Sequence, residues 1–188
     1  MESKDIFAEV PTLQTKRLIL REMTLDDAQA VFVYCSDPEV LKFTGGKAHR
    51  TIEDSKAFLK EVGEKYKKGE SIVWGIFHKD DRNLIGDCGF INWSTQQGRA
   101  ELNYLLSRGY WNQGLMTEVV KEVIQFGFEN MGLNRIQAIC EIANVASSRL
   151  MEKVGMQFEG VLRNYIQHDG KPLDMKMYSI IKSEWAKE

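Results

Sequence analysis

The spacing of apolar residues changes from that of a strand to that of a helix within one central stretch of the chain. Residues 101–106 alternate with a period of two, which predicts a strand with Glu101 and Leu102 on opposite faces. Residues 107–114 contain two glycines and polar side chains, which is typical of a loop. From Thr117 onward, apolar residues recur at helical spacing. The pattern therefore predicts a strand, a glycine-bearing loop and the start of a helix in succession.

The same analysis predicts the other elements of the chain. We expect a loose lead-in over residues 1–14, followed by strands at 17–21, 72–77, 84–93, 135–141 and on both sides of a turn at 169–172, and helices starting after Thr24, over 52–67 and over 144–154. The resulting order is β-α-α-β-β-β-α-β-α-β-β. It predicts an α+β fold with a mixed central sheet of about seven strands and about four flanking helices, with residues 1–188 as a single domain.

Composition and charge narrow the classes of function. The 188 residues are 43% hydrophobic, and 25 basic against 27 acidic side chains give a net charge of −2, which argues against direct nucleic-acid binding through overall charge. Three widely spaced cysteines fit neither a disulfide framework nor a C-x-x-C metal site. We see no signal peptide and no apolar run of the ~18 residues that a membrane span needs, so we expect a cytoplasmic protein without a metal site.

The central loop has the geometry of a phosphate-binding site. Backbone N–H groups gather at the positive end of a helix, and a loop that leads into one favours an anion. Gly109 and Gly114 match the outer glycines of a nucleotide-triphosphatase loop, but Leu115 and Met116 stand where lysine and a hydroxyl residue are required. The glycine fingerprint of dinucleotide-binding proteins is absent as well. The sequence therefore predicts a phosphate loop of another kind.

Several motifs in a common order make the chain resemble the GNAT acyltransferase superfamily. They match in particular its RimJ/RimL-type branch, whose members acetylate the N-terminal alanine or serine of ribosomal proteins. The resemblance covers residues 12–185 and rests on these segments: Thr15-Lys16-Arg17-Leu18-Ile19-Leu20-Arg21, Ala100-Glu101-Leu102-Asn103-Tyr104, Gly109-Tyr110-Trp111-Asn112-Gln113-Gly114, Thr117-Glu118, Asn144-Val145-Ala146-Ser147-Ser148, Glu152-Lys153-Val154-Gly155-Met156, Glu159-Gly160-Val161-Leu162-Arg163 and Glu184-Trp185.

The resemblance implies acetyl transfer from acetyl-CoA to an amine, with CoA as a product. It implies that backbone amides of the central loop receive the cofactor pyrophosphate, and that a backbone N–H between Leu102 and Leu106, where the strand diverges from its neighbour, serves the oxyanion. The cofactor-binding loop residues are Trp111, Asn112, Gln113, Gly114, Leu115, Met116 and Thr117. Two of them depart from the family pattern, which has a glycine where Asn112 stands and a small residue where Met116 stands.

The resemblance also suggests roles for individual side chains. Glu101 is the candidate base, acting through water, although solvation or pairing with Arg99 would explain a carboxylate there equally well. Asn144 matches the residue whose amide contacts the pantetheine arm, and it is also a good helix N-cap. Ser147 matches a serine near the thioester sulfur. Many relatives have a tyrosine that acts as general acid at the position of Met151. Met151 cannot donate a proton, so this role falls to Ser147, to water or to no group.

The acceptor and several other readings stay open at this point. An N-terminal α-amine has a pKa near 8 and needs only a weak base, which suits a site with one carboxylate. Polyamines would favour several carboxylates, for which Asp87, Glu101 and Glu141 are available; an amine-bearing antibiotic and a non-catalytic acetyl-CoA-binding module are further alternatives. A cysteine hydrolase using Cys140 and His168 is the rival from another class. The oligomeric state is open too, a homo-oligomer included.

Overall fold

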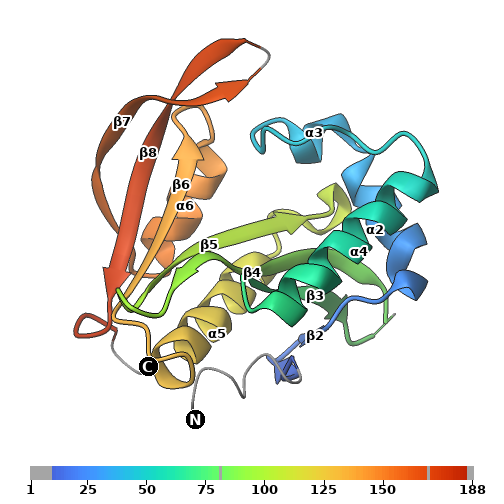
Figure 1. Ribbon diagram of the computed structural model, residues 1–188, viewed down its shortest axis with the longest axis horizontal. Helices are drawn as coiled ribbons and strands as arrows, with labels where there is room; N and C mark the ends of the chain where they lie inside the picture. Colours follow the sequence, from blue (N-terminus) through green and yellow to red (C-terminus); the bar gives the residue numbers. More distant parts are fainter. Residues whose placement is uncertain (1–9, 81, 169, 186–188) are drawn as a thin grey trace.

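The computed structural model describes residues 10–80, 82–168 and 170–185, and it contains one mixed sheet of eight strands in the order β1-β2-β3-β4-β5-β6-β8-β7 (Figure 1). The strands are β1 (Leu13–Gln14), β2 (Leu18–Arg21), β3 (Ile72–His78), β4 (Leu84–Ser94), β5 (Arg99–Leu106), β6 (Arg135–Glu141), β7 (Gln157–His168) and β8 (Lys171–Ile181). The α-helices are α2 (Ala28–Cys35), α3 (Pro38–Leu41), α4 (Ile52–Lys68), α5 (Leu115–Glu129) and α6 (Val145–Lys153), and two short 3₁₀ helices are η1 (Leu25–Asp27) and η2 (Arg108–Tyr110).

The predicted α+β class and the predicted order of the main elements are confirmed. The structure adds two short elements, β1 and α3, neither of which is long enough to show a period in the sequence. The first helix ends before Asp37-Pro38 as expected, but the chain does not stay irregular there. Asp37 accepts a hydrogen bond from the Glu39 backbone N–H and starts α3, with Pro38 at the first helical position. Of the expected lead-in, residues 1–9 lie outside the described residues.

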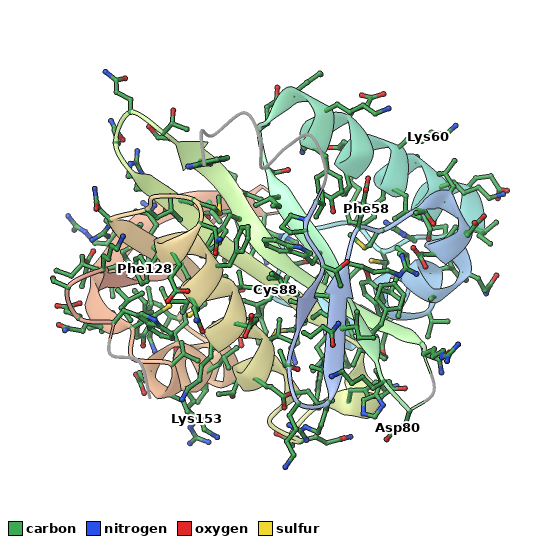
Figure 2. The ribbon with its side chains drawn as sticks, turned by 90° about the horizontal axis from the view of Figure 1, so that it is seen from below. Phe58, Lys60, Asp80, Cys88, Phe128 and Lys153 are labelled. Carbon is green, nitrogen blue, oxygen red and sulfur yellow. The ribbon has the colours of Figure 1, made fainter. Side chains whose placement is uncertain are left out.

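Helices cover both faces of the sheet. On one face, Tyr34 of α2 hydrogen-bonds Asp87 of β4. Three residues further along β4, Phe90 points to the other face, where it lies against Gly127 of α5. In Figure 2, Cys88 of the central strand lies between α5, where Phe128 is labelled, and α4, where Phe58 is labelled. The sheet is therefore buried on both sides, which explains the nearly continuous apolar runs of β3 and β4.

The sheet opens between β5 and β6. The two strands pair in parallel at three positions, from Arg99 with Arg135 to Glu101 with Gln137. Beyond that point β6 stays paired with β8 alone and β5 with β4 alone. Figure 1 shows β5 and β6 diverging from their shared lower end. Along the diverging part, residues 102–106 of β5 have no ladder partner on the β6 side among the described residues. Their edge is available to a ligand.

None of the helices in the described part of the chain has the length and apolar character that crossing a membrane requires. The three cysteines, Cys35, Cys88 and Cys140, are buried and carry free thiols. Burial raises the pKa of the Cys35 thiol to about 12, so this thiol stays protonated at neutral pH. Across residues 10–80, 82–168 and 170–185, no three His, Cys, Asp or Glu side chains form a group suited to a metal ion.

Candidate active site

The N-terminus of α5 has free backbone donors. At three other α-helices a side chain accepts hydrogen bonds from backbone N–H groups: Asp37 at α3, Asp54 at α4 and Asn144 at α6. Helix α2 continues directly from η1, and its first N–H donates to the Leu25 carbonyl. At α5 the N-cap residue is Gly114, which has no side chain to accept such a bond. The first N–H groups of a helix have no partner within the helix. The amides that follow Gly114 are therefore available to an anion.

The side chains around this helix start explain how the loop keeps its amides exposed. Leu115 and Met116 are buried in the core, at 1% and 9% exposure, while residues 111–114 lie at the surface. The helix begins at Leu115 and not at Thr117 as the apolar pattern suggested. Met116 thus fills core space rather than the loop, which accounts for a large residue at a position where the family has a small one.

Two side-chain contacts fix the loop, one to the end of β5 and one to η2. The Trp111 indole Nε1 donates to the Leu106 carbonyl at 2.7 Å, and the Gln113 side chain donates to the Gly109 carbonyl at 3.0 Å. Asn112 has a φ of 60°, in the left-handed region that glycine and asparagine adopt more readily than other residues. The conformation explains why asparagine can replace the glycine of the family pattern.

The opening between β5 and β6 is bridged by a pair of hydroxyl groups. Tyr104 of β5 lies beyond the last residue that pairs with β6, and its hydroxyl is 2.7 Å from the Ser147 hydroxyl of α6. Burial raises the pKa of Tyr104 well above its ordinary value, although the hydrogen bond with Ser147 acts in the opposite direction. The phenol therefore stays protonated at neutral pH and forms a neutral hydrogen bond with Ser147.

Tyr104 was missed as a site residue by the sequence reasoning. Its alternation with Leu102 indicates a residue that points to the same face, and nothing local in the sequence shows that Ser147 lies opposite. Met151 is buried at 1% exposure and packs in the core. Met151 therefore cannot supply a proton, and Tyr104 is the phenol that hydrogen-bonds Ser147.

Glu101 approaches from the other face of the sheet. It is the last β5 residue paired with β6, and it is half-buried. The Asn92 side chain lies 3.4 Å from its Oε2 atom, whereas Arg99 donates to the Gln97 side chain. Pairing of Glu101 with Arg99, the alternative explanation for this carboxylate, is not observed. Glu101 and Ser147 reach the start of the divergence from opposite sides.

Asn144 caps α6, because its Oδ1 accepts from the Ser147 backbone N–H at 3.1 Å. The cap holds the turn that carries Ser147 and leaves the Asn144 amide nitrogen free to donate elsewhere. The proposed pair of Cys140 and His168 is not formed. Cys140 pairs with Lys176 of β8 and His168 is opposite Lys171, so the two are separated by roughly 17 Å along the sheet.

The sequence profile of the acetyltransferase (GNAT) domain matches residues 17–157, which is most of the chain. The chain belongs to the GNAT acetyltransferase family. This GNAT chain is 39% identical over 172 residues to the uncharacterized N-acetyltransferase YoaA of Bacillus subtilis, covering 92% of this chain and 97% of that protein. It is 26% identical over 179 residues to the ribosomal protein uS5-alanine N-acetyltransferase of Escherichia coli, with 93% and 92% of the two chains covered.

A solved GNAT structure agrees with the fold described above. The acetyltransferase (GNAT family) of Bacillus anthracis superposes with a TM-score of 0.83 at 27% identity, covering 93% of this chain and 100% of that one. The GNAT family uses acetyl-CoA, and the relatives include several N-acetyltransferases. The chain is an acetyl-CoA-dependent N-acetyltransferase.

Proposed function

We propose that this GNAT enzyme acetylates the N-terminal α-amine of a protein, as a member of the RimJ/RimL type. The observation that carries the proposal is the arrangement at the strand opening: one carboxylate, Glu101, on one side and the hydrogen-bonded pair of Tyr104 and Ser147 on the other. About one-tenth of an amine with a pKa near 8 is deprotonated at pH 7, so it needs only one modest base, whereas a lysine side chain needs a stronger one.

In this proposal the residues at the opening share the proton transfers of one direct displacement in a ternary complex. The amine nitrogen forms a bond to the thioester carbonyl carbon, and the carbon–sulfur bond breaks with its electrons on sulfur. Glu101 accepts the proton that the amine loses, through one water molecule. A backbone N–H of the unpaired β5 edge, between Leu102 and Leu106, donates to the oxyanion. Ser147 gives a proton to the leaving thiolate, and that proton is replaced from solvent through the hydrogen-bonded Tyr104 hydroxyl, so both side chains end the cycle neutral.

The cofactor-binding residues of the proposal are those of the uncapped helix start. Backbone amides of residues 112–116 receive the pyrophosphate beside Trp111, whose own N–H donates to the Arg108 carbonyl. Thr117 in the first turn of α5 adds a hydroxyl close to it. The free amide nitrogen of Asn144 contacts the pantetheine arm. Acetyl-CoA would supply the activated acetyl group, and CoA leaves as the product.

The uS5-alanine enzyme, which matches this chain over nearly its whole length, supports a ribosomal protein as the acceptor. Buried free thiols are suited to a reducing compartment, and we place the reaction in the cytoplasm on that ground. Residues 1–188 form one catalytic domain in this proposal.

The test is an acetyl-CoA turnover assay that follows released thiol with four acceptors: peptides with N-terminal alanine or serine, a blocked peptide with a lysine side chain, and spermidine. We expect turnover on the two α-amine peptides. Glu101→Gln should lower kcat by about a hundredfold, because a general base contributes on that order. Ser147→Ala and Tyr104→Phe should each lower kcat less, since a thiolate leaves without a strong acid, and the double variant should resemble the single ones.

Glu64→Gln, an exposed carboxylate on α4, serves as the matched control and should leave kcat unchanged. Turnover confined to spermidine would refute the N-terminal acceptor and retain the transferase. Equal rates for Glu101→Gln and Glu64→Gln would remove the base role from Glu101.

A further inference from the structure

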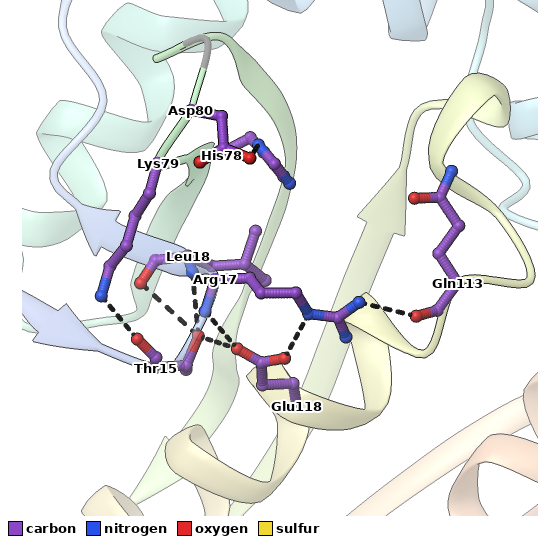
Figure 3. A network of polar contacts seen from close by, with 8 residues as sticks. All are labelled: Thr15, Arg17, Leu18, His78, Lys79, Asp80, Gln113 and Glu118. Atoms are coloured by element: carbon purple, nitrogen blue, oxygen red, sulfur yellow. Dashed lines mark hydrogen bonds and ion pairs between the residues drawn. The ribbon is translucent and has the colours of Figure 1, made fainter.

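Arg17, the residue before β2, connects the start of the sheet to the start of α5 (Figure 3). Its Nη1 atom donates to the Gln113 carbonyl at 3.0 Å, and its Nε atom donates to Glu118 Oε2 at 2.9 Å. The Arg17 backbone N–H donates to Glu118 Oε1 at 2.8 Å. One residue thus holds both the loop that precedes α5 and the first turn of the helix itself.

Glu118 is held firmly enough to act as an anchor for this arginine. Besides its contacts with Arg17, its carboxylate accepts a hydrogen bond from the Thr15 hydroxyl. Burial acts to raise the pKa of Glu118, but the hydrogen bonds from Thr15 and Arg17 outweigh it and lower the pKa. The Lys79 ammonium in turn donates to the Thr15 carbonyl at 2.7 Å. The Arg17 guanidinium therefore has a fixed position and orientation relative to α5.

The contact with the Gln113 carbonyl determines where the next amide points. In a trans peptide the C=O and the following N–H point in opposite directions from one plane, and the described chain has no cis peptide bonds. When Arg17 binds the Gln113 carbonyl, the Gly114 N–H is directed away from Arg17. A glycine at this position, with φ 74°, would otherwise let the peptide plane rotate at little cost.

We infer that Arg17 is a positioning residue for the phosphate-binding loop, which it keeps in the orientation that presents the amides after Gln113 to the pyrophosphate of acetyl-CoA. The inference rests on the proposed cofactor site. Arg17 does not contact the reacting atoms in this account. Its effect is therefore on recognition of the pyrophosphate and not on the chemical step.

A purely structural salt bridge would behave differently. The side chains of Arg17 and Glu118 are 40% and 19% exposed, and pairs of this kind contribute little to stability. The chain offers a control at the other end of β2: Arg21 pairs with Asp27 at 2.9 Å, with side chains 39% and 10% exposed, and contacts the 3₁₀ helix η1 instead of the loop. Arg17→Gln and Arg21→Gln each remove one ion pair of similar exposure, and Arg21→Gln also removes a guanidinium that lies over the Phe77 ring.

The experiment measures binding of CoA and of pantetheine, which lacks the pyrophosphate, by calorimetry to the wild type, Arg17→Gln, Arg17→Lys and Arg21→Gln. We expect Arg17→Gln to weaken CoA binding by about tenfold and to leave pantetheine binding unchanged. Arg17→Lys should be intermediate, because a single ammonium cannot hold Glu118 and the Gln113 carbonyl together. Arg21→Gln should bind both ligands like the wild type.

Turnover measured over a range of acetyl-CoA concentrations provides a second readout, in which Arg17→Gln should raise KM for acetyl-CoA while kcat stays that of the wild type. Equal loss for CoA and pantetheine, or no loss for either, would overturn the inference and leave the proposed function intact. A wild-type protein that binds CoA no better than pantetheine would overturn the proposed cofactor site, and this inference with it.

Discussion

Asp87 is a buried carboxyl group in the middle of the sheet, and its ionisation should be measurable in the stability of the protein. The side chain is 4% exposed and faces α2, where the Tyr34 hydroxyl donates to Oδ2 at 2.9 Å. Burial raises the pKa of Asp87 to about 6, although the Tyr34 hydrogen bond lowers it in part. At neutral pH the fold therefore contains a carboxylate in a poorly solvated place.

The free-energy cost of this ionisation follows from the two pKa values. A rise from the ordinary 3.8 to about 6 corresponds to about 3 kcal/mol at about 1.4 kcal/mol per pH unit. Because the pKa is higher in the folded protein than in the unfolded chain, the folded protein binds more protons between these values. Stability therefore falls as pH rises from about 4 to about 6, and the whole cost is present above that range.

Asp87→Asn removes the titration and keeps the shape of the side chain, including an oxygen that accepts from Tyr34. Integrating the linkage relation between pH 5 and pH 8 gives about 1.4 kcal/mol. We therefore compare the free energy of unfolding of Asp87→Asn with that of the wild type at each pH. We expect this difference to favour the variant by about 1.4 kcal/mol more at pH 8 than at pH 5. Any constant effect of the new amide cancels in this comparison, as do the titrations of histidines that both proteins share.

The assay is urea unfolding of both proteins at pH 5 and pH 8, followed by circular dichroism and analysed by linear extrapolation. Tyr34→Phe is the complementary variant. Removing the donor raises the pKa of Asp87 further, so this variant should lose more stability at pH 8 than at pH 5. A difference between Asp87→Asn and the wild type that is the same at both pH values would refute the assignment of a raised pKa to Asp87.

Three further sets of variants test the core packing, the phosphate-binding loop and a surface ion pair. Gly127→Ala places a methyl group 2.8 Å from the Phe90 ring and should destabilise by about 1–3 kcal/mol in urea unfolding, whereas Gly63→Ala on α4 meets nothing within 4 Å and should stabilise by about 0.5–1 kcal/mol. Asn112→Ala should weaken CoA binding in calorimetry, because alanine resists the left-handed conformation, while Asn112→Gly should bind as the wild type does. Hydrogen bonds from Arg135 and Ser179 lower the pKa of Glu159 to about 2, and Glu159 is partly exposed. Glu159→Gln should therefore lower the free energy of unfolding by less than about 1 kcal/mol at pH 7. This loss should shrink as pH falls from about 4 towards 2, which an acid titration of stability will show.

The sequence predicted well those helices and strands in which one face packs against the core, because burial of that face sets the spacing of apolar residues. The strand expected at 135–141 is observed over these residues, because alternate side chains of β6 are buried. The helix expected at 52–67 is observed at Ile52–Lys68, with acidic residues at its start and Gly69 in the left-handed conformation at its end. The start of α5 was misplaced by two residues, because Leu115 and Met116 are buried and α5 has no capping side chain to mark it.

The parts of the site that the sequence could not predict are contacts between residues far apart in the chain. Tyr104 and Ser147 are separated by 43 residues, and Arg17 and Glu118 by 101. Each of these residues has an ordinary explanation within its own segment: a strand aromatic, a helix serine, a charge beside a strand and an acid in a first helical turn. Only the divergence of β5 from β6 and the crossing of β2 by α5 bring the members of each pair together.

The helix starts and the buried carboxyl indicate where this fold gives up stability. The chain satisfies the backbone donors of α3, α4 and α6 with its own side chains, each of which contributes about 1 kcal/mol, and it provides Gly114 at α5. A side-chain cap at that position would satisfy the donors that we propose bind the cofactor pyrophosphate. Arg17 supplies the fixation that a cap would otherwise give, because it binds the Gln113 carbonyl and leaves the amide N–H groups of the loop unoccupied. Gly114→Asp should therefore raise the free energy of unfolding less than a cap usually does, because aspartate is strained at φ 74°. It should also abolish the preference for CoA over pantetheine, because it places a carboxylate at the proposed pyrophosphate site. Undiminished preference in that variant would mean that the anion binds elsewhere.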